Sequence, residues 1–222
     1  HTILRELPQP RSRPPMVKGF CQQGLALRPT ITKVALSHGY EVEEPRSQNF
    51  YPDFTLKPIG QSDGFLAFDV KTTYRKNKSG TFSFTLGGYT SFIRTNTPTK
   101  NIVHSFEKYA SHYIVGFVYT RLAHGKSGEA RIFSPSNVSD IPLPYVDVDV
   151  FVREKWRIAG DVAGSGNTTN IGSIVGNIDD FRNGPGIFVS EREFLNYWRS
   201  YGRTAATRNY ANIKQFRNIN AV

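Results

Sequence analysis

Two aspartates and one lysine stand where a metal-dependent hydrolase could use them. They lie in YPDFTLKPIGQSDGFLAFDVKTTY, residues 51–74, in which the strand-like runs 53–57 and 65–71 flank a loop rich in Pro, Gly, Ser and Asp. Such a loop between two apolar runs is typical of a β-hairpin. If Lys57 pairs with Phe65, the same register places Asp53 opposite Asp69, with Cβ atoms ~5 Å apart on one face.

Two carboxylates held this close repel each other, and a divalent cation removes the conflict. Strand alternation adds Lys71 to the same face and turns Leu66, Phe68 and Val70 to the other. Lys71 would then face an anionic substrate or the attacking water. A Pro-Asp pair and an Asp-x-Lys triplet also occur by chance, so a purely structural hairpin remains the alternative.

A second unusual stretch is GDVAGSGNTTNIGSIVGNI, residues 160–178, which has no charged residue after Asp161 in a strongly basic chain. No Gly-Lys-Ser/Thr follows its glycines, so it is not a P-loop. One interpretation is a flexible surface loop. The other is reading of base edges, with close backbone approach at Gly164 and Gly166, Asn167 suited to adenine, and Thr168 suited to a thymine methyl.

The composition favours a nucleic-acid partner. The 222 residues hold 28 Lys+Arg against 18 Asp+Glu, a formal net charge of +10, and a domain this basic usually meets a polyanion. A merely soluble basic protein is the alternative. Cys21 is the one cysteine, so no internal disulfide forms, which suits a reducing cytoplasm. No apolar run reaches the ~18 residues of a membrane helix, so no membrane partner is expected.

The elements that would carry these residues indicate an α/β (α+β) domain with a central mixed sheet flanked by helices. A helix is predicted over 28–38, and a second one from Ser190, with Glu193 completing a capping box. The second helix carries an apolar stripe of Phe194, Leu195, Trp198 and Tyr201, which is expected in the core. Strands are predicted at 53–57, 65–72, 81–86, 112–120 and 148–158. We expect one domain over 1–222, in which 1–19 is an extended arm and 20–222 is the core.

Several segments together resemble the EcoRV family of type II restriction endonucleases, within the PD-(D/E)xK nuclease superfamily. The matching segments are HGY at 38–40, YPDFTL at 51–56, DVKTTY at 69–74, FTLGGYTSFIR at 84–94, AGSGNTTNIGS at 163–173 and EFLNYWR at 193–199. The likeness runs from about Arg28 onward and is far more specific than the short acidic motif alone.

The resemblance implies a Mg²⁺-dependent endonuclease that acts as a homodimer on double-stranded DNA and cuts the palindrome GATATC bluntly at its centre. It also implies a single nuclease domain, in which the arm 1–19 holds part of the dimer contact and 20–222 is the catalytic and DNA-recognition core. It implies that Asp53, Asp69 and the carbonyl of Val70 bind the metal and that Lys71 is catalytic. It also implies that the bases are contacted in the major groove by Gly164, Ser165, Gly166, Asn167 and Thr168. In the minor groove it implies contacts from Gln48 and Asn49, which lie in RSQNFY, residues 46–51. Positions expected to face the DNA backbone are Thr72, Thr73, Ser91, Arg94, Lys100, Arg203 and Arg208.

The chain departs from the family pattern in four places. Gly24 stands where the family has a third acidic residue, and no Asp or Glu lies between Glu6 and Glu41. Ser47 replaces a glutamine, the N-terminal segment is shorter, and 95–101 carries a small insertion. Two other functions remain open: a structure-selective nuclease such as a junction resolvase, and a DNA-binding protein without catalysis. The neutral loop argues against the first, and the intact Asp53, Asp69 and Lys71 argue against the second.

Overall fold

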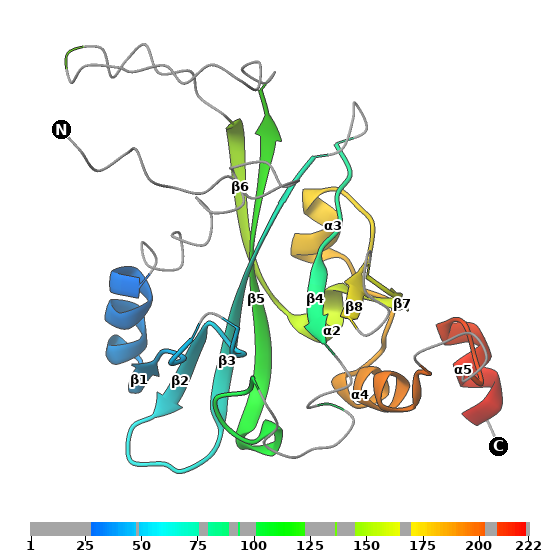
Figure 1. The fold of residues 1–222 in the computed structure, drawn as a ribbon, viewed down its shortest axis with the longest axis horizontal. Helices are drawn as coiled ribbons and strands as arrows, with labels where there is room; N and C mark the ends of the chain where they lie inside the picture. The colour runs from blue at the N-terminus through cyan, green and yellow to red at the C-terminus, as the bar shows by residue number, and fades with distance from the viewer. Residues whose placement is uncertain are drawn as a thin grey trace, which may run out of the picture.

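The fold is built on a mixed sheet that is covered on both faces. The computed structural model describes residues 28–47, 49–75, 80–88, 93, 101–122, 136, 145–164, 170–202 and 208–220. Within these residues the main sheet has five strands in the order β1-β2-β3-β5-β6 (Figure 1). Its strands are β1 (Tyr40–Glu43), β2 (Phe54–Pro58), β3 (Phe65–Tyr74), β5 (Tyr109–Arg121) and β6 (Tyr145–Glu154).

The hairpin of β2 and β3 has the predicted register. Phe54 pairs with Phe68 and Leu56 with Leu66, so the next facing pair beyond the strand end is Asp53 and Asp69. Alternation along β3 also agrees, because Phe68 belongs to the core cluster on one face and Ala67 to the cluster on the other. The acidic pair is therefore set by the hairpin itself.

The centre of the sheet is the parallel pair of β3 and β5, which runs from Phe65 beside Tyr109 to Tyr74 beside Tyr119. β6 then pairs antiparallel with β5, with Gly116 opposite Phe151. A Cβ at Gly116 would lie 2.2 Å from the Phe151 ring, so this ring packs where only glycine leaves room. Strands of both directions flank β3, which confirms the predicted mixed sheet.

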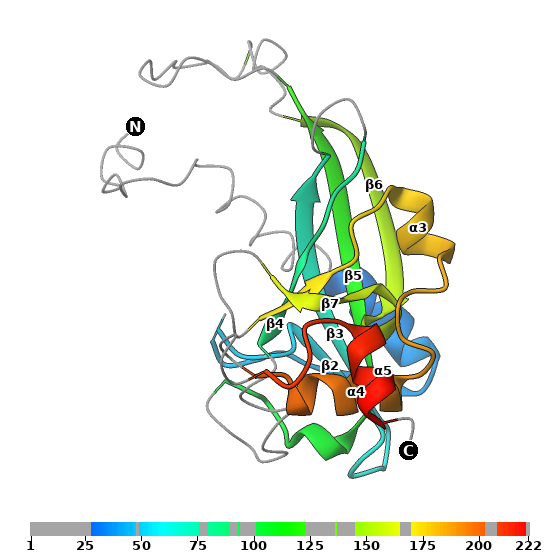
Figure 2. The same cartoon turned by 90° about the vertical axis from the view of Figure 1, so that its right-hand side faces the viewer.

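A second, smaller sheet lies over the main one, in the order β4-β8-β7 (Figure 2). It consists of β4 (Thr85–Gly88), β7 (Ala159–Ala163) and β8 (Asn170–Ser173). Two predictions were wrong here. The strand predicted over 148–158 ends at Glu154, because 155–158 form the short helix α2 (Lys155–Ile158) and bury its first and last residues on one side. The stretch 160–178 is a loop only in part, since β7 and β8 enclose its centre.

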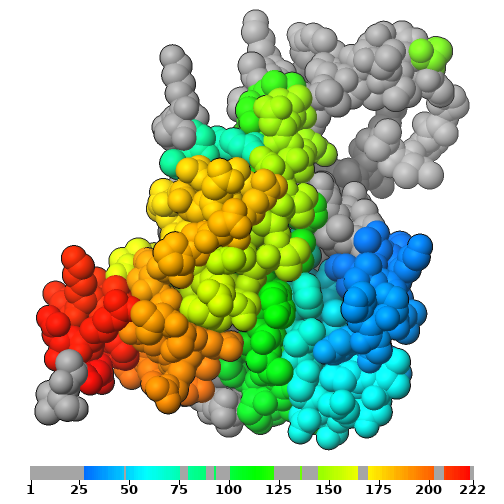
Figure 3. Space-filling view, turned by 180° about the vertical axis from the view of Figure 1, so that it is seen from behind, coloured from blue at the N-terminus to red at the C-terminus, as the bar shows by residue number. Residues whose placement is uncertain are grey.

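The helices cover the two faces of the main sheet. Residues 28–37 form a helix that packs on β1–β3 around Ala35, Phe54 and Leu56. The opposite face carries the larger core, with the small sheet, the short helix η1 (Phe106–Lys108), α3 (Ile178–Asn183), α4 (Glu191–Ser200) and α5 (Ile213–Asn220). In Figure 3 the first helix (blue) and α4 with α5 (orange, red) lie at opposite sides of the molecule.

The start of α4 agrees with the sequence in part. Ser190 caps it by accepting a hydrogen bond from Glu193 N at 3.2 Å. In a capping box the Glu193 side chain would accept a hydrogen bond from Ser190 N. Here Glu193 Oε2 accepts instead from Val189 N, one residue earlier, at 2.8 Å. The predicted stripe is confirmed, with Trp198 and its neighbours in the large core. In the described part of the chain, no helix has the length and apolar character needed to cross a membrane.

Candidate active site

The acidic pair lies where β2 begins beside the middle of β3. Asp53 precedes β2 directly, and its Oδ2 accepts a hydrogen bond of 2.7 Å from Val70 N. Asp69 is only 4% exposed. Burial of a carboxylate costs free energy unless a positive charge or hydrogen-bond donors compensate it, so the surroundings of Asp69 decide what this site can do.

Lys71 supplies one such charge. Its Nζ lies 2.6 Å from Asp69 Oδ2, and its side chain is 25% exposed. The same Oδ2 is buried and receives no well-oriented hydrogen bond from any described residue. The contact is therefore an ion pair with poor hydrogen-bond geometry, and it leaves this oxygen with acceptor capacity toward the site.

The two carboxyl groups perturb each other. Burial and the charge of Asp69 raise the pKa of Asp53 to about 6, although the charge of Lys71 and the hydrogen bond from Val70 N act in the opposite direction. Repulsion between close carboxylates is the ordinary cause of such a rise. The metal-free site thus holds a carboxyl group that ionises only near neutral pH.

The residues present fit a divalent metal ion with oxygen ligands. Among the residues that the structure describes, no three His, Cys, Asp or Glu side chains gather into a metal-binding group. Two carboxylates, one with a buried oxygen short of donors, and a neighbouring backbone carbonyl form the small, hard ligand set that Mg²⁺ completes with water and substrate phosphate.

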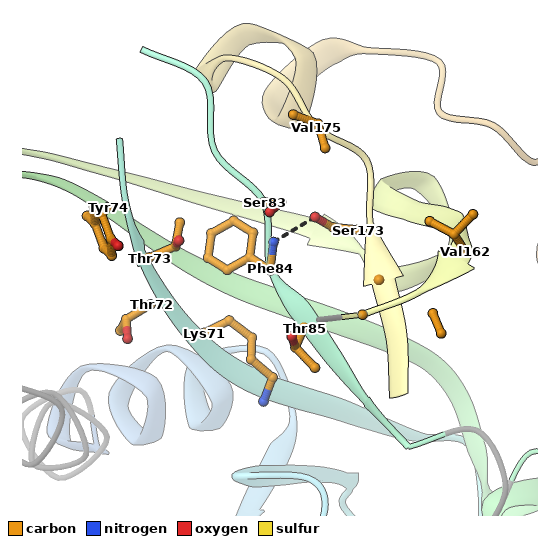
Figure 4. Close-up of a pocket in the computed structure, with 13 residues that line it drawn as sticks. Lys71, Thr72, Thr73, Tyr74, Ser83, Phe84, Thr85, Val162, Ser173 and Val175 are labelled. Atoms are coloured by element: carbon orange, nitrogen blue, oxygen red, sulfur yellow. Dashed lines mark hydrogen bonds between the residues drawn. The ribbon is translucent and has the colours of Figure 1, made fainter. Parts of the chain in front are cut away.

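A cleft of about 550 Å³ joins the end of β3 to the small sheet. Figure 4 shows Lys71, Thr72 and Thr73 of β3 on one side, and Thr85 of β4 and Val162 of β7 across from them. Gly164, where the predicted recognition loop begins, lines the same cleft. Lysine and threonine side chains on one wall and a glycine backbone on the other form a surface suited to a polar, anionic ligand.

The base of the predicted recognition loop is closed by a hydrogen bond of 2.7 Å from Gly164 N to Asn170 O. A Cβ at Gly164 would lie 3.2 Å from Thr85 Oγ1, which is tighter than ordinary contact. The loop therefore leaves the small sheet at a point where β4 and β7 pack closely. The other predicted members of this loop, Ser165, Gly166, Asn167 and Thr168, lie outside the described residues.

The remaining predicted residues are described only in part. Asn49 is exposed, and its Nδ2 donates a long hydrogen bond of 3.5 Å to Asn101 Oδ1. Arg208 donates from Nε to Gly202 O at 2.9 Å and lies over the Tyr201 ring at 4.6 Å. None of these contacts involves the acidic pair.

The structure brings six of the predicted residues to one region: Asp53, Asp69, Lys71, Thr72, Thr73 and Gly164. The predicted residues that lie outside the described part of the chain are Gln48, Ser91, Arg94, Lys100 and Arg203, and Gly24 also lies outside it.

Three buried residues beside the acidic pair were not predicted. Lys155 is 3% exposed, and its Nζ lies 4.4 Å from the centre of the Tyr51 ring. A hydrogen bond of 2.7 Å joins Tyr51 Oη to His112 Nδ1. Burial and the charge of Lys155 lower the pKa of His112 to about 3, so its imidazole is neutral. One available signal was Lys155 itself, a lysine directly before the apolar Trp156 in a segment interpreted as core strand.

Comparisons with known proteins agree with this geometry. The family model described as restriction endonuclease EcoRV matches residues 24–221. The type II restriction enzyme EcoRV of Escherichia coli is 54% identical over 193 residues, which cover 86% of this chain and 78% of that enzyme.

Among solved structures, the NlaIV restriction endonuclease aligns with 99% of this chain and 80% of its own, at a TM-score of 0.45 and 14% sequence identity. The family assignment rests on the sequence matches, which extend over the acidic hairpin, the small sheet and both C-terminal helices. The chain belongs to the EcoRV family of type II restriction endonucleases, metal-dependent enzymes that act on double-stranded DNA.

Proposed function

We infer that this protein is a Mg²⁺-dependent endonuclease that cuts GATATC bluntly at its centre and acts as a homodimer in the cytoplasm. The observation that carries the inference is the cleft that Lys71 and Gly164 share. A single bound duplex could contact both the acidic hairpin and the base of the recognition loop. The loop segment 163–173 also matches the family pattern without a substitution.

The proposed roles follow from the chemistry of each group. Asp53, Asp69 and the carbonyl of Val70 hold Mg²⁺, which when bound supplies positive charge to the phosphate under attack. Lys71 orients the attacking water or contacts the phosphate, and its position 2.6 Å from Asp69 Oδ2 supports this role. Thr72 and Thr73, farther along the same wall of the cleft, contact the DNA backbone.

Specificity is assigned to the loop and to the DNA itself. Backbone groups of two glycines, the Asn167 amide and the Thr168 methyl suit the outer base pairs of the hexamer. The central TA step is unstacked at low cost and is read through its deformability. A palindrome presents two identical half-sites, which is why a two-fold symmetric dimer is proposed.

The test is digestion of plasmid DNA with Mg²⁺, followed by sequencing of the ends. Blunt ends within GATATC support the proposal, and cuts at another hexamer refute the recognition assignment. Cuts that follow DNA structure instead of sequence would indicate a resolvase-like enzyme. A monomeric mass at concentrations at which the protein cuts its site would contradict the dimer.

A further inference from the structure

Lys155 is a buried charge for which the proposed reaction has no role. It opens α2 directly after β6 and is 3% exposed. Lysine is almost never this deeply buried unless a partner compensates the desolvation of its ammonium group. A side chain retained at such a cost requires a physical explanation, and its neighbours supply one.

Lys155 lies beside the segment that leads into the acidic hairpin. Its Nζ lies over the Tyr51 ring at 4.4 Å, and Tyr51 is followed by Pro52 and Asp53. On the other side, a Cβ built at Gly87 of β4 would lie 4.0 Å from Nζ. The ammonium group is thus enclosed between the segment that carries Asp53 and the small sheet.

Lys155 also interacts electrostatically with Asp69. Burial lowers its pKa to about 8, the carboxylate of Asp69 acts in the opposite direction, and Lys71 adds to the lowering. Lys155 is therefore mostly charged at pH 7. The charge of Glu191 contributes to the raised pKa of Tyr51. Glu191 is not among the groups that shift the pKa of Asp53 or of Lys155.

The charges at this site can be counted. Two carboxylates, Asp53 and Asp69, stand against two ammonium groups, Lys71 and Lys155, so the metal-free site is close to neutral when all four are ionised. A neutral site attracts a divalent cation less strongly than a site with net negative charge. The missing negative charge would come from the phosphate of bound DNA.

We propose that Lys155 is a positioning residue whose buried ammonium group counterbalances the Asp53–Asp69 pair in the metal-free enzyme and thereby weakens metal binding until DNA is present. The proposal rests on the proposed metal site. Its partner is a divalent cation of the Mg²⁺ class, and Lys155 is not a ligand. The aromatic face of Tyr51 compensates part of the desolvation of the ammonium group.

The test measures Mn²⁺ binding to the DNA-free protein at pH 7.0 by electron paramagnetic resonance. Lys155→Met keeps the side-chain volume and removes the charge, and it should bind Mn²⁺ roughly tenfold more tightly than the parent. Lys155→Gln, a neutral variant with a polar end, should change the affinity in the same direction. Lys155→Arg should retain the weak affinity of the parent. Lys214→Met, which removes an exposed positive charge on α5, is the matched control and should have no effect.

Unchanged or weaker Mn²⁺ binding in both neutral variants, with thermal unfolding still cooperative, would overturn the proposal. So would tighter binding that persists when Asp69→Ala is added, because the ion would then lie elsewhere. If the parent cuts GATATC with Mg²⁺ but the neutral variants bind no more Mn²⁺ than it does, only the role of Lys155 fails. If the parent neither cuts DNA nor binds Mn²⁺ in its presence, the proposed function fails as well.

Discussion

Replacing Asp53 by Asn should make the metal-free protein more stable while abolishing cleavage. Burial and the neighbouring charge of Asp69 raise the pKa of Asp53 to about 6, from an ordinary value of 3.8. One pKa unit corresponds to ~1.4 kcal/mol, so this shift corresponds to about 3 kcal/mol of destabilisation once Asp53 is ionised. Solvent screening at a half-buried group reduces this figure, and a gain of about 1–3 kcal/mol is expected.

The direction of the pH dependence follows from the raised pKa. Between about pH 4 and pH 6 the folded protein holds a proton that the unfolded chain has released, so stability falls as the pH rises through this window. Above pH 6 the penalty is constant. Asn has no such titration, and its side-chain oxygen can still accept the hydrogen bond from Val70 N. The advantage of Asp53→Asn should therefore be absent near pH 4 and complete at pH 7.5.

The assay is thermal unfolding in EDTA at pH 4.0 and pH 7.5. For a chain of this size, 1 kcal/mol shifts Tm by about 2–4 °C, so a rise of several degrees is expected at pH 7.5 only. Asp63→Asn, in the exposed hairpin loop, is the matched control. An Asn variant no more stable than the parent at pH 7.5, or equally stabilised at both pH values, would refute the reasoning. In the presence of DNA, Mg²⁺ should stabilise the parent but not this variant.

Four further outcomes are expected. Lys71→Met should slow Mg²⁺-dependent cleavage by about 10²–10⁴-fold, as measured in single-turnover digests, while specific binding in Ca²⁺ persists. Gly116→Ala should destabilise the fold by about 1–3 kcal/mol, because the new methyl group would lie 2.2 Å from the Phe151 ring; urea denaturation measures this. Arg208→Ala should lower the slope of log K for DNA binding against log salt concentration by about one, if the side chain contacts a phosphate. An unchanged slope would indicate that Arg208 has a structural role only. Asn167→Ala should lose about 1–3 kcal/mol of discrimination, seen as GATATC cutting reduced relative to weak nonspecific binding.

The acidic hairpin could be predicted from the sequence because its determinants are local. Apolar alternation and a turn set the register, and the structure pairs Phe54 with Phe68 as that register requires. A slip by one residue would have turned Asp69 away from Asp53 and toward the first helix. A local sequence pattern is sufficient to predict the strand register where the partner strand is the next one along the chain.

Lys155 could not be found in this way because tertiary structure brings it beside the Tyr51 ring, next to the acidic pair. The parallel pairing of β3 with β5 and the antiparallel return of β6 bring it there from a distant part of the chain. Strands β7 and β8 of the small sheet were missed for a related reason, whereas the strand predicted over 81–86 overlaps β4 (Thr85–Gly88). β8 contains Gly172 and spans only Asn170–Ser173, so its strand character depends on its neighbours and not on its own propensity.

The closed base of the recognition loop has a consequence for divergence and engineering. The bond from Gly164 N to Asn170 O joins the two residues that flank 165–169, whereas Asp53, Asp69 and Lys71 belong to the other sheet or its border. We expect exchanges within this five-residue segment to leave the backbone on either side of that bond, and the register of β2 and β3, unchanged. If the segment reads base edges as proposed, new target preferences would arise by substitution in a small exchangeable segment, and the cleavage chemistry would be inherited intact.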